Sequence, residues 1–509
     1  MDTTRWHPAG RLRIVWIAAC ALALLPFLFV TIPPLADAPG HLGQIAIQAA
    51  APDSPLRHYF GFHWGLRLNL GVDLTVELLR HLLGLERAFW LVCAAIPMLI
   101  VVAIVALARV ANRDAAAASF ALPFAYAYPF NFGFLNYMLG MALALLAFAL
   151  WIEMAERPQR REMLFWAIVP ALMICHAVGG GLLPLMIIAD STARYLWPKP
   201  GKAAIRAFLV TIRPLLAAVP LAVLAHGPEG GGFIATFTLE SKASAIVQAL
   251  RDQNRLLDIA SMALVIAVPV IGLALGARYR RTGLAVVLVL AGLFLVMPAE
   301  LNGSSYNDMR LVPALAIVGL VLLDWSRVSR KVTTRVMLAG FALFAVRMAV
   351  TSRGFAAYAT SYAAEARALP HIAPGSRVLT LVTRQCGAAR AWRMDRLDHF
   401  GVMATARREA WVNALWDVSS IHLLQITYRP SPDFYHDPSH YAWPAVCIDP
   451  SNAWERETIE QAAPRLPLDK VDYLWLIHAN LPPGPWNARL VPAWSAGGST
   501  LYRTIRPAA

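Results

Sequence analysis

Long apolar runs alternate with short polar or basic breaks over the first 350 or so residues of the chain. Most runs have about the length needed to cross the hydrocarbon core of a bilayer, so the pattern predicts a bundle of transmembrane helices. Eleven runs can be marked: 14–32, 88–108, 115–130, 134–152, 163–176, 181–196, 207–225, 257–276, 282–298, 311–325 and 334–351. The first run ends in two prolines rather than in a small-residue cleavage site, so we expect it to be retained as a span.

Basic side chains predict how these spans are oriented, because positively charged loops stay in the cytoplasm. A basic cluster follows each even-numbered run, as in Arg157, Arg160 and Arg161 after the fourth run. The start of the chain is also basic, which predicts a cytoplasmic N-terminus. The opposite side then receives the segment 33–87, the loops 226–256 and 298–310, and everything after about residue 351.

The segment 33–87 is long and amphipathic. Helical apolar spacing from Gln44 to Ala51 and from Leu74 to Leu85 predicts two helices that lie on the membrane surface, with Asp73 as a candidate N-cap of the second. The loop 226–256 opens with a glycine-rich stretch, which is more typical of a hinge than of a phosphate-binding loop, and continues as an amphipathic segment.

From Gly354 the composition becomes that of a soluble domain. Runs at 377–382, 471–477 and 499–504 predict strands, and the periodicity of 398–416 predicts a helix. The sequence therefore predicts an α-helical polytopic membrane domain, 1–353, followed by an extracytoplasmic α/β domain, 354–509.

The composition agrees with this fold class. Hydrophobic residues make up 58% of the chain and charged residues 15%, well below the roughly 25% of soluble domains, and the mean hydropathy is +0.52. The net charge of +14 is accounted for by the cytoplasmic loops, so it does not indicate a nucleic-acid partner.

The five cysteines fall into two groups. Cys20, Cys93 and Cys175 lie in apolar runs and are expected to be packing residues. Cys386 and Cys447 both fall in the extracytoplasmic domain, where oxidation is permitted, and we predict a disulfide between them. The alternative is a pair of free buried thiols. No spacing of cysteines and histidines indicates a structural zinc site.

Polar side chains gather at the predicted extracytoplasmic ends of the spans, all at one depth. They are Asp37, His41, Asn131, Asn136, Tyr137, His176, Asp308 and Arg310. A cleft formed from them would hold carboxylates, a guanidinium and histidines beside the outer leaflet. Structural alternatives exist: the asparagines can cap helices, His176 can satisfy a backbone carbonyl freed by the glycines, and Arg310 can snorkel to headgroups or pair with Asp308. Arg213 and Arg347 lie inside predicted spans, and Arg347 is a weaker candidate for phosphate binding.

Several short motifs carry a resemblance to a known family. They are Leu35-Ala36-Asp37-Ala38-Pro39-Gly40-His41-Leu42, the turn from Asn131 to Gly140, Asn307-Asp308-Met309-Arg310, and Asp398-His399-Phe400. Together with the long first loop, they make the chain resemble, over nearly its whole length, the GT-C superfamily of integral-membrane glycosyltransferases, which use polyprenyl-phosphate-linked sugars. The resemblance implies that Asp37 is the catalytic base or acceptor-positioning residue. Many members have paired acids there, whereas Ala38 follows Asp37; this departure argues against a metal-dependent mechanism and leaves a divalent cation, Mg²⁺ or Mn²⁺, as an alternative.

The residue chemistry fits that function independently. A sugar joined through phosphate already has a good leaving group, so transfer needs a carboxylate for the acceptor hydroxyl and donors for the departing phosphate. Asp37 suits the first task, and Arg310 with His41 or His176 suits the second. We therefore expect an inverting transferase with a glycan, lipid or protein as acceptor. The resemblance implies that it lies in a bacterial inner membrane, which places its C-terminal domain in the periplasm.

Two other classes of function remain open. A lipid-linked-sugar flippase or transporter would be expected to place ionisable groups near the bilayer midplane, often in inverted repeats, and neither feature is visible in the sequence. A non-catalytic envelope glycan assembly protein would depend on the region after Gly354 and would tolerate loss of Asp37.

Overall fold

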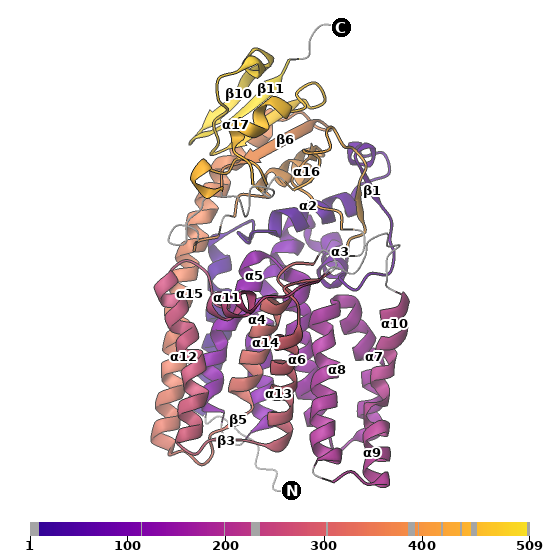
Figure 1. Cartoon of the computed structure of the whole chain (residues 1–509), viewed down its shortest axis with the longest axis vertical. Helices are drawn as coiled ribbons and strands as arrows, with labels where there is room; N and C mark the ends of the chain where they lie inside the picture. Colours follow the sequence, from indigo (N-terminus) through magenta and orange to yellow (C-terminus); the bar gives the residue numbers. More distant parts are fainter. Residues whose placement is uncertain are drawn as a thin grey trace. The chain divides into compact units, whose positions relative to one another are not determined.

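The computed structural model describes residues 10–112, 115–197, 199–224, 235–301, 304–384, 392–394, 396–418, 421–437, 440–448 and 456–505. These residues form two compact units, whose elements are labelled in Figure 1. The first, here called the helical unit, takes its described residues from 1–28, 66–75 and 91–352. The second, here called the mixed unit, takes them from 29–65, 76–90 and 353–509.

Helical elements occupy all eleven predicted runs. They are α1 (Gly10–Leu24) with η1 (Leu25–Phe29), α4 (Leu85–Ala111), η3 (Ala116–Tyr126) with α5 (Tyr128–Phe132), α6 (Leu135–Glu153), α7 (Pro158–Cys175), α8 (Ala177–Ser191) with η4 (Thr192–Leu196), α9 (Lys202–Ile212) with η5 (Arg213–Ala217) and α10 (Ala218–Leu224), α12 (Arg255–Ala274), α13 (Arg281–Val296), α14 (Asn307–Val321) and α15 (Arg330–Glu365). The amphipathic α11 (Leu239–Gln248) precedes α12, and two short strand pairs, β2 (Ala235–Thr236) with β4 (Glu300–Leu301) and β3 (Arg278–Tyr279) with β5 (Leu323–Asp324), close loops.

Five of the described helical segments are long and apolar enough to cross a membrane by themselves: Leu85–Ala111, Leu135–Glu153, Lys202–Leu224, Arg255–Ala274 and Arg330–His371. The segment Lys202–Leu224 is apolar but almost entirely exposed, with side chains such as Leu209 and Val223 on the outside. An exposed apolar face of this length fits contact with lipid. The figure of eleven crossings stays a prediction.

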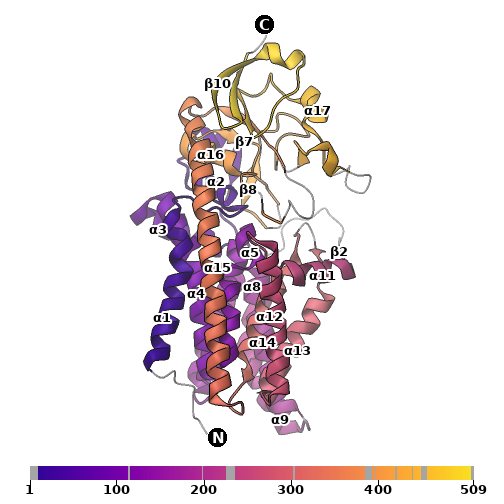
Figure 2. The same cartoon turned by 90° about the vertical axis from the view of Figure 1, so that its left-hand side faces the viewer.

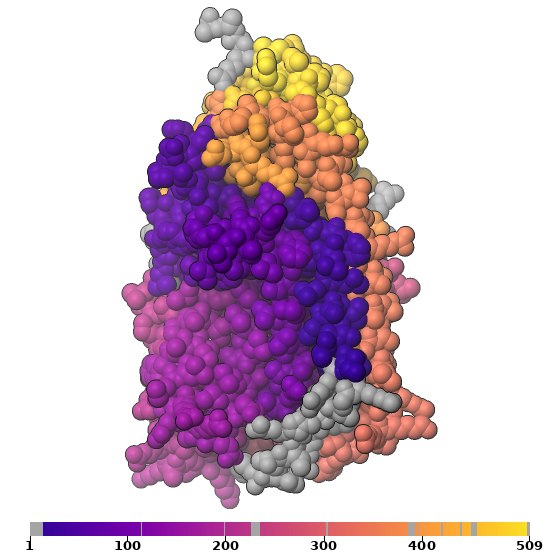
Figure 3. All heavy atoms as spheres, turned by 180° about the vertical axis from the view of Figure 1, so that it is seen from behind, coloured from indigo at the N-terminus to yellow at the C-terminus, as the bar shows by residue number. Residues whose placement is uncertain are grey.

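Small residues let the membrane helices approach closely. This is common in membrane proteins, because the hydrophobic effect does not drive helix association in lipid and close packing matters more. A Cβ atom at Gly140 of α6 would lie 3.4 Å from the Cα of Gly179 in α8, and one at Gly180 would run into the backbone of Leu172 in α7. On another side of the unit, Trp16 of α1 packs edge-to-face on Phe341 of α15, with ring centroids 4.8 Å apart. Figure 3 shows these two segments, indigo and orange, in direct contact.

Two of the predicted spans differ in detail from what the sequence suggests. The third is a 3-10 helix followed by the short α5 rather than one α-helix, and prolines at positions 123 and 129 explain the break, because each lacks a backbone N–H. The last was expected to end at residue 351, but α15, a helix of 36 residues, continues to Glu365, as Figure 2 shows. At about 1.5 Å per residue it is far longer than a hydrocarbon core requires.

A five-stranded sheet forms the centre of the mixed unit, in the order β10-β11-β9-β6-β7. The strands are β6 (Arg377–Val382), β7 (Trp411–Val412), β9 (Tyr473–Ile477), β10 (Leu490–Ala496) and β11 (Ser499–Thr504). β6 runs parallel to β7 and β9, whereas β9, β11 and β10 pair antiparallel. Every residue of β9 is buried, as expected for a strand inside a sheet. The three predicted strands are confirmed.

The helix predicted over 398–416 is wrong for most of its length. The structure has a short turn η7 (Phe400–Val402), a six-residue helix α16 (Met403–Arg408) and then β7. Glu409 adopts a left-handed conformation with φ of 51°, which ends α16. Trp411 and Val412 are aromatic and β-branched, and they pair with Arg377 and Val378 of β6.

The first loop contributes to the mixed unit. Its elements are α2 (Ala38–Ala49), η2 (Pro55–His58) and β1 (Phe60–Phe62), and β1 pairs with β8 (Leu424–Ile426) of the C-terminal region. A Cβ at Gly43 of α2 would run into Val402. The structure therefore groups this segment with the C-terminal residues, whereas the sequence-based division placed all of 33–87 in the membrane domain.

The two amphipathic helices of the first loop also need correction. Most residues of α2 are buried, so protein covers the side that the sequence suggested for water, and its place on the membrane surface stays a prediction. The second helix, α3, spans Gly71–Leu83. Asp73 therefore lies in its first turn rather than at its N-cap.

Candidate functional site

Asp37 lies at the N-cap of α2, but its side chain makes no capping hydrogen bond. An N-cap carboxylate ordinarily accepts from the backbone N–H of the second or third helical residue. Here the second residue is Pro39, which has no N–H to give. The carboxylate instead lies beside His399, with Asp37 Oδ1 3.7 Å from His399 Nε2, and 16% of its side chain remains exposed.

Aromatic and imidazole rings extend from His399 in a chain of contacts within the mixed unit. The ring of Trp416 contacts His399 with centroids 4.6 Å apart and His41 with centroids 5.7 Å apart, both edge-on. Trp416 Nε1 donates to His422 Nε2 over 3.2 Å. The structure therefore brings Asp37 and His41 together with three residues from the C-terminal region, and we call these five residues the Asp37 cluster.

Burial keeps two of these histidines neutral. It lowers the pKa of His399, an effect that Arg384 reinforces and that Asp437 and the Ala414 carbonyl oppose. Burial, helped by the nearby His41, lowers the pKa of His422 to about 3. At neutral pH both imidazoles are thus uncharged, and His422, whose Nε2 already accepts from Trp416, is the weaker base of the two.

Three of the predicted residues meet within the helical unit. The Tyr137 hydroxyl donates to the Arg310 carbonyl oxygen, and the Tyr137 ring packs edge-on against His176 with centroids 5.6 Å apart. The Arg310 guanidinium lies 4.1 Å from the centroid of the Phe134 ring. We call Tyr137, His176 and Arg310 the Arg310 cluster. Asn136 is a structural neighbour: it donates to Asp73 Oδ2 over 3.1 Å and accepts from the Val72 N–H over 2.5 Å, which fixes the start of α3.

His176 caps a helix, yet one side of its ring stays available. Its Nδ1 accepts from the N–H groups of Val178 and Gly179 over 3.1 and 3.0 Å, at the start of α8. A nitrogen that accepts carries no proton, so in the neutral ring the proton lies on Nε2. His176 therefore caps α8 through Nδ1 instead of binding the backbone carbonyl that the sequence suggested, and its Nε2–H is a hydrogen-bond donor.

Asp308 is engaged elsewhere than expected. The sequence suggested pairing with Arg310, but Asp308 Oδ2 lies 3.2 Å from Lys242 Nζ and accepts from Ser241 Oγ over 3.0 Å. Lys242 is 5% exposed and its ammonium group also lies between the rings of Phe237 and Phe294. Sequence reasoning missed Lys242, because a lysine in an amphipathic segment ordinarily faces water.

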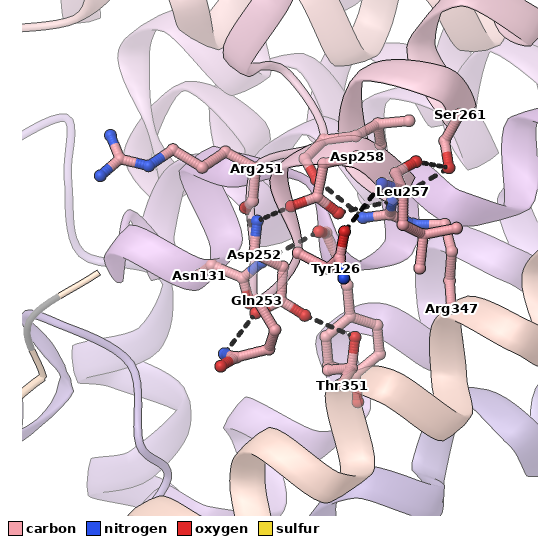
Figure 4. Close-up of polar contacts among 12 residues, drawn as sticks. Tyr126, Asn131, Arg251, Asp252, Gln253, Leu257, Asp258, Ser261, Arg347 and Thr351 are labelled. Carbon is pink, nitrogen blue, oxygen red and sulfur yellow. Dashed lines mark hydrogen bonds and ion pairs between the residues drawn. The ribbon is translucent and has the colours of Figure 1, made fainter. Parts of the chain in front are cut away.

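Asn131 and Arg347 belong to a buried structural network (Figure 4). The Asn131 side chain donates to the carbonyl oxygens of Tyr126 and Arg251 over 3.1 and 3.3 Å. Arg347 Nη1 donates to Asp258 Oδ1 over 2.8 Å, and Thr351 Oγ1 donates to Asp252 Oδ2 over 2.6 Å. Arg347 is therefore the partner of a buried carboxylate, which corrects its assignment as a phosphate candidate.

The predicted substrate-site residues thus divide between the two units: Asp37 and His41 lie in the mixed unit, and the remaining six lie in the helical unit. His399 entered the sequence reasoning only as part of a motif, and Trp416 and His422 did not enter it at all. No local signal marks them, because they come close to Asp37 only through the fold of the mixed unit.

A metal site and the disulfide were the remaining expectations. Within the described part of the chain, no group of three or more histidine, cysteine, aspartate or glutamate side chains is arranged to hold a metal ion. The possible divalent cation, Mg²⁺ or Mn²⁺, stays a prediction. Cys447 is disulfide-bonded, and its predicted partner Cys386 lies outside the described residues. Peptide mapping without reductant would test the predicted pairing.

The combination of a polytopic helical unit with a strand-containing C-terminal region has the architecture expected from the resemblance to the GT-C glycosyltransferases. Comparison with solved structures confirms that fold. The chain is similar to ArnT from Cupriavidus metallidurans in the apo state, with a TM-score of 0.51 and 12% identity over 98% of this chain and 99% of ArnT. The crystal structure of ArnT from Cupriavidus metallidurans bound to undecaprenyl phosphate aligns over 98% of both chains, with a TM-score of 0.49 and 12% identity. No family model matches the sequence, and a search of curated proteins gives no match.

Proposed function

We propose that the protein is a membrane glycosyltransferase that moves a sugar from a polyprenyl-phosphate donor to an acceptor hydroxyl on a glycan, lipid or protein. The observation that carries this proposal is the setting of Asp37: a partly exposed carboxylate that caps no helix, beside a neutral imidazole, in a chain with the fold of ArnT. ArnT has been crystallised with undecaprenyl phosphate, which supports a polyprenyl phosphate as the donor's carrier.

The proposed reaction is a single displacement that inverts the configuration at the sugar carbon. Asp37 orients the acceptor hydroxyl and accepts its proton as the oxygen attacks that carbon. The bond to the phosphate oxygen breaks, and its electron pair leaves with the polyprenyl phosphate. No step is assigned to a metal ion.

We assign the departing phosphate to the Arg310 cluster. Arg310 supplies a guanidinium, which suits phosphate recognition, and His176 supplies an Nε2–H donor. Cations and donors placed where negative charge develops lower the barrier to the displacement. The alternation of basic loops favours a cytoplasmic N-terminus, and the resemblance to the GT-C glycosyltransferases supports the periplasmic face of a bacterial inner membrane as the proposed location.

The test compares variants of the purified protein in lipid nanodiscs that contain polyprenyl-phosphate sugars. Asp37→Asn should abolish transfer while donor binding persists. Asp53→Asn is the matched control, because Asp53 lies on the same loop and is exposed. Full transfer by Asp37→Asn would overturn the proposed mechanism. Loss of transfer on adding a chelator would show that a metal ion is required after all.

The same preparation separates the rival functions. Donor binding without transfer, accompanied by movement of the lipid between leaflets, would identify a flippase. A wild-type protein that binds no lipid-linked sugar would identify an assembly protein instead.

A further inference from the structure

The position of His399 points to a role in the proposed reaction that the sequence did not suggest. The ring is buried, and Trp416 packs edge-on against it. His399 Nδ1 lies 2.7 Å from the carbonyl oxygen of Ala414. A carbonyl oxygen can only accept, so Nδ1 carries the proton and donates it.

This bond determines what the other ring nitrogen can do. With the proton on Nδ1, the neutral ring has a lone pair on Nε2, and Nε2 is the atom 3.7 Å from Asp37 Oδ1. A carboxylate and a lone pair repel each other unless a proton or a hydroxyl lies between them. The geometry therefore favours a state in which Asp37 and His399 hold one proton jointly, or in which an acceptor hydroxyl bridges them.

We infer that His399 is the positioning residue for Asp37 and the final acceptor of the proton that Asp37 takes from the acceptor hydroxyl. This inference rests on the proposed function. The acceptor O–H bond breaks as its oxygen bonds to the sugar carbon, and the proton passes to the Asp37 carboxylate and then to His399 Nε2. The resulting imidazolium returns the proton to water after product release. Asp37 is thereby ionised again for the next turnover.

The surrounding charges are compatible with this transfer. Among the described residues, Asp437 raises the pKa of His399 and Arg384 lowers it, Asp37 Oδ1 lies 3.7 Å from His399 Nε2, and Arg384 is itself paired with Asp398. The carboxylates of Asp37 and Asp437 therefore stabilise a protonated His399, and the opposing effect of Arg384 is reduced by its ion pair with Asp398. Burial keeps His399 neutral before the reaction, and the negative partners stabilise it once it holds the proton.

This role gives the C-terminal region a part in the chemistry. His399 places a proton acceptor from the C-terminal region beside the first-loop acid, inside one compact unit.

The experiment uses the full-length protein in nanodiscs and two readouts. The first is the pH dependence of transfer for His399→Asn and His399→Gln. Asparagine keeps an amide donor for the Ala414 carbonyl, and glutamine reaches the Nε2 position, but neither can take a proton. We expect both variants to bind the donor normally, to lose about 10²-fold in kcat/KM and to show an acid limb displaced from that of the wild type, because Asp37 alone then determines it. Wild-type rates with an unchanged profile would overturn the inference.

The second readout does not depend on activity. Protein labelled with ¹³C at the histidine rings is titrated by NMR, and the His399 signal is the one missing from His399→Asn. Asp37→Asn should lower the titration midpoint of His399, because it removes a negative partner, whereas Asp53→Asn should leave the midpoint unchanged. Equal midpoints in all three proteins would overturn the inference. If the wild type transfers no sugar at all, the proposed function fails, and the midpoints still decide whether Asp37 and His399 act as a pair.

Discussion

The buried ion pair between α12 and α15 allows a quantitative stability prediction. Replacing Arg347 by methionine removes a guanidinium that is 2% exposed and that donates to Asp258 Oδ1 over 2.8 Å. The same group donates to Ser261 Oγ over 3.2 Å and to the Leu250 carbonyl oxygen over 2.7 Å. Methionine fills a similar volume but leaves the Asp258 carboxylate, also 2% exposed, without its cation.

The magnitude follows from what remains around that carboxylate. Breaking a buried ion pair from one side costs about 3–5 kcal/mol, because the remaining charge stays buried and uncompensated. The Asp252 N–H still donates to Asp258 Oδ2 over 2.8 Å, so we expect a cost near the lower end, about 3 kcal/mol. The double variant Arg347→Met/Asp258→Asn removes both charges and keeps an amide oxygen for that N–H. It should therefore be more stable than Arg347→Met alone.

Reversible unfolding with SDS in mixed micelles, followed by tryptophan fluorescence, measures these free energies. Arg280→Met is the matched control: Arg280 also lies near an aspartate, Asp324 at 3.7 Å, but its side chain is 51% exposed. An exposed pair contributes at most about 1 kcal/mol. If Arg347→Met lowers the free energy of unfolding no more than Arg280→Met does, the Arg347–Asp258 pair does not contribute as predicted. Equal free energies of unfolding for Arg347→Met and for the double variant would contradict the prediction as well.

Three further predictions concern other parts of the chain. In α8, Gly180→Ala should lower the free energy of unfolding by about 2 kcal/mol or more, because its Cβ would meet backbone atoms. Gly181→Ala, whose Cβ would meet nothing within 4 Å, should raise it by up to about 1 kcal/mol, and the SDS assay measures both. The pKa of His422 is about 3 in the folded protein and about 6.5 in the unfolded chain, so the unfolded chain binds a proton at His422 at a higher pH than the folded protein does. The free energy of unfolding should therefore fall as the pH drops from 6.5 toward 3, by at most about 1.4 kcal/mol per pH unit. Unfolding of His422→Asn at pH 7.5 and 5 should show a smaller loss than wild type. Pro39→Ala restores an N–H that can cap α2 through Asp37; a capping bond is worth about 1 kcal/mol, so transfer should slow about five-fold, and unchanged transfer would argue against this account of the carboxylate.

The membrane helices were predictable because each is encoded locally. An apolar run of sufficient length must form its backbone hydrogen bonds within itself in lipid, so helices at 135–153 or 255–274 follow from composition alone. The same local reasoning failed for α2. Gln44 and Gln48 suggested a water-facing side, but both are buried with partners: Gln44 donates to the Trp416 carbonyl oxygen over 3.1 Å and Gln48 to Glu77 Oε2 over 2.9 Å. A buried polar side chain that finds a partner far along the chain has the same local pattern as an exposed one.

The candidate site shows the same limit at the level of single residues. Asp37 stood out locally, because an acid directly after a span is costly unless it is hydrated, paired or used. Its neighbour Pro39 even carried the information that the carboxylate would lack one of its usual capping donors, since proline has no N–H. The partner that Asp37 finds instead, His399, could not be identified this way, since its role depends on which ring nitrogen faces the acid. That choice is made by a hydrogen bond to the carbonyl of Ala414, a group that every residue possesses and no sequence pattern marks. Local sequence can therefore nominate the acid, but the proton acceptor beside it is defined only by tertiary structure.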